Sequence, residues 1–132
     1  SLIENLLKNE KDLVRIQSRL PALKSSTREE ILKRMLIVSD YIHANLNEDL
    51  SLEELASVGC ISKFHFLRLF KIAFNKTPYQ FINEERVRKG RGMIQRTTFS
   101  INEIAHSLGF SNASSFSRMF FNQTGLYPTQ FR

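Results

Sequence analysis

Apolar residues recur along this chain every three or four positions, and no segment alternates apolar and polar residues as a strand would. One stripe predicts a helix that ends at about Asn45, and a later stripe predicts a helix from about Ser62 to Asn75. Residues 1–24 have apolar positions at the same spacing. The sequence therefore predicts an all-α fold. The two stripes are Ile31, Met35, Val38, Ile42 and Leu46, and Phe66, Leu69, Phe70, Ala73 and Phe74.

Polar residues mark the predicted helix starts. In a capping box, a Ser or Thr hydroxyl accepts a hydrogen bond from the amide three residues later, and a Glu there bonds back to the cap. A further start is predicted at Pro78, after Thr77, for a helix that reaches about Arg96 and is about 30 Å long. The predicted capping boxes are Thr27 with Glu30, Ser51 with Glu54, and Ser100 with Glu103.

The C-terminal part of the chain contains the same unit twice. Residues 51–56 (SLEELA) return 49 residues later as residues 100–105 (SINEIA). Residues 66–70 (FLRLF) return 50 residues later as residues 116–120 (FSRMF), so the second copy has one extra residue before its longer helix. Each copy predicts a short helix, a tight turn and a longer helix. A duplicated helix-turn-helix on a basic chain favours binding to double-stranded DNA.

Charge is distributed unevenly along the chain, whose net charge is +6. Residues 28–61 carry a net charge of −4, because seven acidic residues outnumber three basic ones. Residues 62–96 carry a net charge of +7, with nine basic residues and two acidic ones. A solvated helix surface accounts for charge of either sign, whereas a basic segment that begins with the first longer helix favours a surface that binds phosphates.

The sequence contains no recognisable catalytic or metal-binding pattern. His43, His65 and His106 are scattered, and Cys60 adds no metal-ligand spacing to them. No Gly-rich phosphate loop, nucleophile elbow or paired carboxylates occur in the sequence. We therefore expect no enzyme activity, metal or cofactor. The single cysteine, the lack of a signal-peptide pattern and the lack of a long apolar run favour a cytoplasmic protein without membrane association.

The most specific part of the second copy is the SINEIA segment followed by Gly109-Phe110, FSR at residues 116–118, Phe120, Gly125, Pro128 and Phe131-Arg132. This run closely resembles the C-terminal DNA-binding domain of the AraC/XylS family of bacterial transcription regulators. The resemblance covers about residues 30–132. It implies seven helices in two helix-turn-helix units, each of which inserts a recognition helix into the major groove.

The resemblance also implies domain boundaries and partners. It assigns residues 27–132 to the DNA-binding domain, with residues 27–76 as the first subdomain, 77–96 as the connecting helix and 97–132 as the second subdomain. Residues 1–26 would be a helical linker left from a missing sensor or dimerisation domain, since the chain begins at Ser1 without Met. A small-molecule effector would act only through that missing domain, RNA polymerase is a candidate partner, and the fragment would be monomeric.

Nine residues on the outward sides of the two longer helices are the implied DNA contacts. Arg68 and Arg118 hold equivalent positions, and each could bond a guanine, clamp a phosphate or pair with an acidic side chain of its own domain. Cys60 replaces the usual turn glycine, which predicts a slightly reshaped first turn, and Phe121 replaces a usual lysine. The contacts are Lys63, Phe64, Leu67, Arg68 and Lys71 in the first helix, and Ala113, Ser114, Ser117 and Arg118 in the second.

Two hypotheses about function follow. The first is a transcription regulator that binds double-stranded DNA sequence-specifically and inserts two recognition helices into successive major grooves. The second is a helical protein-interaction module of AraC-like fold with weak DNA affinity. An acidic surface around Glu48-Asp49 and Glu53-Glu54 would suit the second hypothesis.

Overall fold

The computed structural model describes residues 25–132, so the predicted helix within residues 1–24 lies outside the described part of the chain. Residues 25–132 form seven helices and no strand, which confirms the all-α prediction. The helices belong to two compact units. Residues 25–44 and 50–78 belong to the first unit, and residues 45–49 and 79–132 belong to the second.

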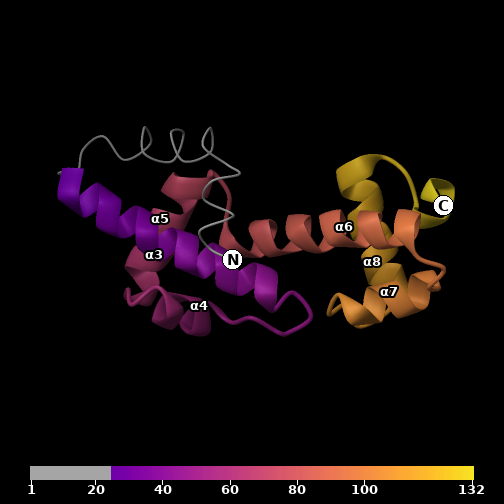
Figure 1. Cartoon of the computed structure of the whole chain (residues 1–132), viewed down its shortest axis with the longest axis horizontal. Coiled ribbons are helices and arrows are strands. Elements are labelled where there is room, and N and C mark those ends of the chain that lie inside the picture. The colour runs from indigo at the N-terminus through magenta and orange to yellow at the C-terminus, as the bar shows by residue number, and fades with distance from the viewer. Residues whose placement is uncertain (1–24) are drawn as a thin grey trace. The chain divides into compact units, whose positions relative to one another are not determined.

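The first unit is a bundle of three helices that contact one another (Figure 1). They are α3 (Ser25–Ala44), α4 (Leu52–Val58) and α5 (Lys63–Phe74). Their buried faces follow the predicted stripes, because residues three and four positions apart lie on one side of a helix. The buried apolar residues are Leu32, Met35, Val38, Ile42, Leu55, Ala56, Phe66, Phe70 and Ala73.

One prediction about the ends of α3 is wrong, and the other, a helix that ends at about Asn45, is confirmed to within one residue. The helix begins at Ser25, so Thr27 lies within its first turn and not at the cap, and Glu30 pairs with Arg34 one turn later. At the other end, the helix stops at Ala44. Leu46 is buried as predicted, but it lies in the turn after the helix and belongs to the second unit. Its apolar side chain continued the spacing of the stripe beyond the last helical turn.

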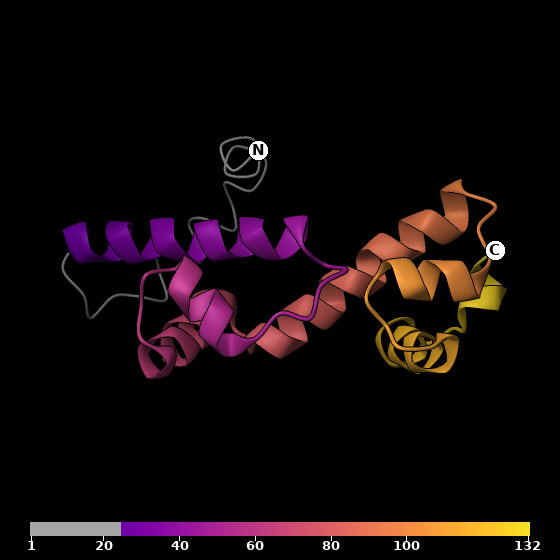
Figure 2. The same ribbon diagram turned by 90° about the horizontal axis from the view of Figure 1, so that it is seen from below.

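The second unit comprises α6 (Pro78–Arg96), α7 (Ile101–Ser107), α8 (Ala113–Thr124) and α9 (Pro128–Phe131) (Figure 2). Side chains from α6, α7 and α8 form one apolar core, and Phe131 of α9 packs against its edge. Within residues 25–132, no helix is long and apolar enough to cross a membrane. The buried core residues are Val87, Ile94, Ile104, Ala105, Leu108, Phe110, Phe116 and Phe120.

Arg86 of α6 attaches residues 45–49 to the second unit. Its Nε donates to the carbonyl oxygen of Leu46 at 2.9 Å, and its Nη2 donates to that of Glu48 at 2.8 Å. The guanidinium also lies 5.7 Å from the centre of the Phe110 ring. Burial of the group lowers the pKa of Arg86, and a carboxylate charge at Asp49 partly opposes that shift. Arg86 therefore acts as an internal clamp and does not belong to the phosphate-binding charge predicted for residues 62–96.

Candidate nucleic-acid interface

The turns of the two helix-turn-helix units are built by equivalent backbone hydrogen bonds. In the first unit, the amide of Ile61 donates to the carbonyl of Ala56 at 3.0 Å, and the amide of Cys60 donates to that of Ser57 at 3.0 Å. In the second unit, Phe110 donates to Ala105 at 3.1 Å, and Gly109 donates to His106 at 3.2 Å. The two turns therefore have the same hydrogen-bond pattern at positions 49 residues apart.

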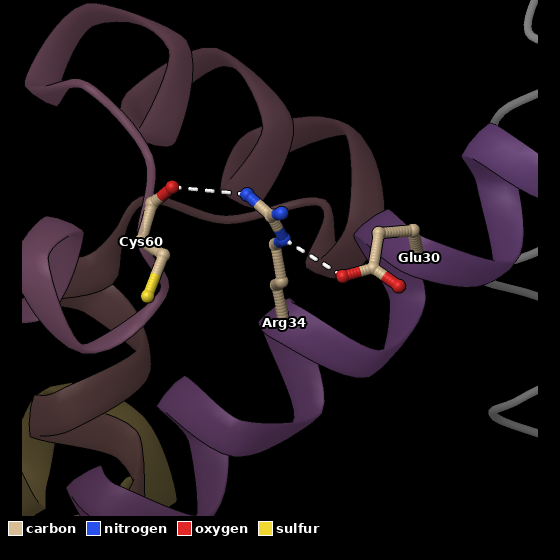
Figure 3. Close-up of polar contacts among 3 residues, drawn as sticks. All are labelled: Glu30, Arg34 and Cys60. Carbon is tan, nitrogen blue, oxygen red and sulfur yellow. Dashed lines mark hydrogen bonds and ion pairs between the residues drawn. The ribbon is translucent and has the colours of Figure 1, made fainter.

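Cys60 adopts the left-handed conformation that Gly109 adopts in the second unit, with φ values of 55° and 85°. The prediction of a reshaped first turn is therefore wrong, because Cys60 keeps the turn and accepts the strain of a left-handed residue with a Cβ. Arg34 also supports this turn, since its Nη1 donates to the carbonyl oxygen of Cys60 at 2.9 Å (Figure 3). The Arg34 Nε meanwhile donates to Glu30 at 3.1 Å (Figure 3).

Matching caps begin the helices of both units. The Ser51 hydroxyl accepts from the amide of Glu54 at 3.1 Å, and the Ser100 hydroxyl accepts from that of Glu103 at 3.0 Å. These bonds confirm the serine half of each predicted capping box, whereas the reciprocal bond from the serine amide to the Glu carboxylate is not formed in either of these two boxes. The longer helices α5 and α8 have 12 residues each, and five residues separate α7 from α8 where four separate α4 from α5. The predicted extra residue of the second copy lies in its turn.

Buried phenylalanines fix which side of each longer helix faces outward. Phe66 and Phe70 anchor α5, with ring centres 5.5 Å apart, and Phe116 and Phe120 anchor α8, with ring centres 5.7 Å apart. All four side chains have no exposed surface. None of the nine predicted contact residues is buried. Lys63, Phe64, Arg68, Lys71, Ser114 and Arg118 are exposed, and Leu67, Ala113 and Ser117 are partly buried.

The outward side chains of α5 are larger and more varied in chemistry than those of α8. Phe64 is 84% exposed, which is the highest value among the exposed large apolar residues of the described chain. It lies between two basic positions, Lys63 and Arg68. On α8, small or short side chains precede the single arginine, Arg118. Of these two helices, α5 is therefore the one that combines an exposed aromatic ring with several cations.

The basic residues of these helices differ in their partners. Within residues 25–132, neither Arg68 nor Arg118 has a hydrogen bond or ion pair from its side chain. Lys63 in contrast forms an ion pair with Glu53 of α4, at 2.7 Å between Nζ and Oε1. The sequence did not predict this pair, because the two residues are ten positions apart and lie on different helices. In the described part of the chain, no group of three or more His, Cys, Asp or Glu is placed to hold a metal ion.

A family model described as a helix-turn-helix domain matches residues 55–132. The chain is 31% identical over 124 residues to the transcriptional regulator ArgR of Pseudomonas aeruginosa. That match covers 94% of this chain and 35% of the relative. The chain spans less than half the length of the curated relatives it matches.

Solved structures of similar fold agree with the family match. A transcriptional regulator from Chromobacterium violaceum with an AraC-type DNA-binding domain has a TM-score of 0.72 and 28% identity. This similarity covers 76% of this chain and 89% of that one. The DNA-binding domain of AdpA, solved with a target DNA, has a TM-score of 0.71 and 23% identity, over 74% of this chain and 88% of that one. The AdpA similarity bears on the fold alone.

Proposed function

The chain belongs to the AraC-type family of helix-turn-helix transcription regulators, and on that premise we propose that it binds double-stranded DNA through α5 and α8. The observation that carries the proposal is the pair of equivalent arginines, Arg68 and Arg118. Each lies on the exposed side of the second helix of its unit without a partner in residues 25–132. A guanidinium that is free in the unbound protein can bond guanine O6 and N7 without first breaking an internal ion pair.

We propose that α5 contributes most of the sequence discrimination. Arg68 offers two hydrogen bonds to a guanine, and the exposed ring of Phe64 and the partly buried Leu67 offer apolar contacts to thymine methyl groups. The short side chains of α8 leave Arg118 as its one long outward polar group among the proposed contacts. Unit two then serves mainly to position the domain on the DNA.

We propose further that one chain occupies two successive major grooves on one face of the DNA. Nineteen residues of α6 separate the two helix-turn-helix segments, which at 1.5 Å per residue is about 28 Å of helix. Successive grooves on one face lie about 34–36 Å apart. This length supports a monomer that performs the task of a symmetric dimer. The sequence also suggests a small-molecule effector, RNA polymerase as a partner and dimerisation of a longer protein. These three stay proposals.

The alternative of a protein-interaction module has less support. Its acidic surface needed Glu48, Asp49, Glu53 and Glu54 together. Glu53 is paired with Lys63, and the Glu54 carboxylate accepts a hydrogen bond from the Tyr41 hydroxyl. Glu48 and Asp49 belong to the other compact unit. Both of the proposed acidic residues of the first unit are therefore engaged by internal partners.

A gel-shift titration with salt tests DNA binding itself. Several phosphate contacts make the logarithm of the binding constant fall steeply and linearly with the logarithm of salt concentration. Selection of bound sequences from random DNA would then supply a preferred site. Binding that is weak and insensitive to salt would refute the proposal and favour the interaction module.

The two arginines are tested on that preferred site. Arg68→Ala should lose about 1–3 kcal/mol of binding free energy and relax the preference at one base pair. Arg118→Ala, the matched variant in the second unit, should lower affinity with a smaller change in preference. An equal loss for Arg68→Ala on every sequence would identify Arg68 as a phosphate clamp and refute its base contact.

The aromatic contact is tested by deleting only the methyl group it would touch. Replacing each thymine of the preferred site by uracil removes the C5 methyl and keeps the hydrogen-bonding edge. One such replacement should weaken binding by the wild-type chain and leave binding by Phe64→Ala unchanged. If the two proteins respond alike to every replacement, Phe64 does not contact a thymine methyl.

A further inference from the structure

The ion pair between Glu53 and Lys63 joins the two helices of the first helix-turn-helix unit on its outward side. Lys63 is the first residue of α5, and Glu53 is in the first turn of α4. Their side chains are 46% and 66% exposed, so both are accessible to a ligand. The hydrogen bond and the charge of Lys63 lower the pKa of the Glu53 carboxyl, so Glu53 is ionised at neutral pH.

The second unit lacks both members of this pair. The residue equivalent to Glu53, 49 positions later, is Asn102, and the residue equivalent to Lys63, 50 positions later, is Ala113. The N-cap serines, the turn bonds and the buried phenylalanines recur in both units. A pair that only stabilised the shared fold would be expected in both. Its presence in one unit points to a property of that unit's outward surface.

In a helix-turn-helix domain, the first helix crosses the phosphate backbone while the N-terminal residues of the second helix enter the groove. That geometry brings Lys63 and Glu53 together to the edge of the groove, where phosphates compete with the carboxylate for the ammonium group. An exposed ion pair is worth only about 0.2–1 kcal/mol. Phosphate can therefore displace Glu53 from Lys63 at small cost.

We propose that Glu53 is an electrostatic latch on Lys63 that weakens sequence-independent DNA binding by the first unit. The inference rests on the proposed function and deepens it. In the free protein the carboxylate neutralises the charge of the lysine. A contact between this lysine and a phosphate therefore gives little net release of counterions. Displaced Glu53 in turn attracts a cation from solution. Because Glu53 weakens the phosphate contact of Lys63, contacts to the bases contribute a larger share of the total affinity.

The test is a salt titration of binding to nonspecific duplex DNA by the wild-type chain and Glu53→Gln. Each phosphate neutralised contributes a slope of about −0.9 to the plot of log binding constant against log salt. Glu53→Gln should steepen the slope by up to about one and raise nonspecific affinity about 1.4- to five-fold at low salt, the range that corresponds to one exposed pair.

Matched variants separate the latch from a general charge effect. In a Lys63→Gln background, Glu53→Gln should leave the salt slope unchanged, because the latched cation is absent. Glu103→Gln removes the same charge from the first turn of α7 and should change the slope less than Glu53→Gln. Circular dichroism melts check that each variant is folded. We expect them to be folded, because the substituted side chains are exposed.

Unchanged or weaker nonspecific binding by Glu53→Gln would overturn the latch and leave the proposed function standing. An equal effect of Glu53→Gln with and without Lys63 would overturn it too, since Glu53 would then act as a general negative charge. Salt-insensitive binding by the wild-type chain is a different result, which would overturn the proposed function and the latch with it.

Discussion

Gly90 and Gly92 of α6 lie two residues apart, yet their surroundings differ sharply. A Cβ built on Gly90 would lie 2.8 Å from Cε1 of Phe116 and 2.9 Å from Cδ1 of Leu108. Both of these side chains are fully buried. A Cβ on Gly92 would have only Nη1 of Arg96 nearby, at 4.0 Å. Replacing each glycine by alanine therefore compares the same chemical change in a crowded and an open setting.

The expected magnitudes follow from two opposing contributions. Alanine is favoured over glycine inside a helix by about 1 kcal/mol, chiefly because glycine loses more backbone freedom on folding. At Gly92 nothing opposes this gain, so Gly92→Ala should stabilise by several tenths to about 1 kcal/mol. At Gly90 the added methyl overpacks the core, at a cost of about 1–3 kcal/mol. Gly90→Ala should therefore range from neutral to about 2 kcal/mol destabilising.

Thermal and urea unfolding of the two variants measure this difference. For a unit of this size, 1 kcal/mol corresponds to a shift of about 4–8 °C in Tm. Gly92→Ala should raise Tm, and Gly90→Ala should leave it unchanged or lower it. In a Leu108→Ala background, Gly90→Ala should cost less than in the wild-type chain, because the truncated leucine no longer meets the added methyl group.

Equal stabilisation by both substitutions would refute the packing argument, since the core would then yield freely around residue 90. A destabilising Gly92→Ala would show that glycine is needed there for a reason that its surroundings do not reveal.

Gly92→Ala should also stiffen α6. The range of half-site spacings that the chain tolerates should then be narrower, and an unchanged range would refute the expectation that Gly92 makes α6 more flexible.

Three further predictions concern the turns, the internal clamp and the footprint. Cys60→Gly should stabilise the first unit by about 0.5–1 kcal/mol in urea unfolding, because it relieves left-handed strain that exceeds the entropic cost of glycine; destabilisation would show that the cysteine side chain contributes packing. Arg86→Met should cost about 1.5–3 kcal/mol, since two carbonyls lose a charged donor. Arg88→Met, at a side chain 73% exposed and paired with Glu85, is its control and should cost less. Hydroxyl-radical footprinting should show one chain protecting two segments about 10 bp apart, whereas an obligate dimer in sedimentation would contradict that arrangement.

The sequence by itself determined the helices and the repeat, because both depend on local chemistry. Apolar spacing identified the buried faces, and the Ser51 and Ser100 caps are formed by residues three positions apart. Gly90 lies three residues after Val87 and four before Ile94, a spacing that predicts the apolar face of α6, and it is buried there. Local reasoning was wrong at the start of α3, where the capping pattern at Thr27 lies inside the helix, and the apolar stripe extended to Leu46, beyond the last helical turn.

Tertiary structure alone decided which charges are available to a ligand and where a left-handed residue needs to be glycine. Arg86 and Lys63 counted equally in the basic segment, but one bonds backbone carbonyls and the other bonds Glu53. At Gly109, a Cβ would meet three atoms at 3.1 Å, contributed by Arg86, Asn47 and Leu46, whereas the side chain of Cys60 is exposed. These partners are distant in sequence, so only the packing of the folded chain brings them within contact distance.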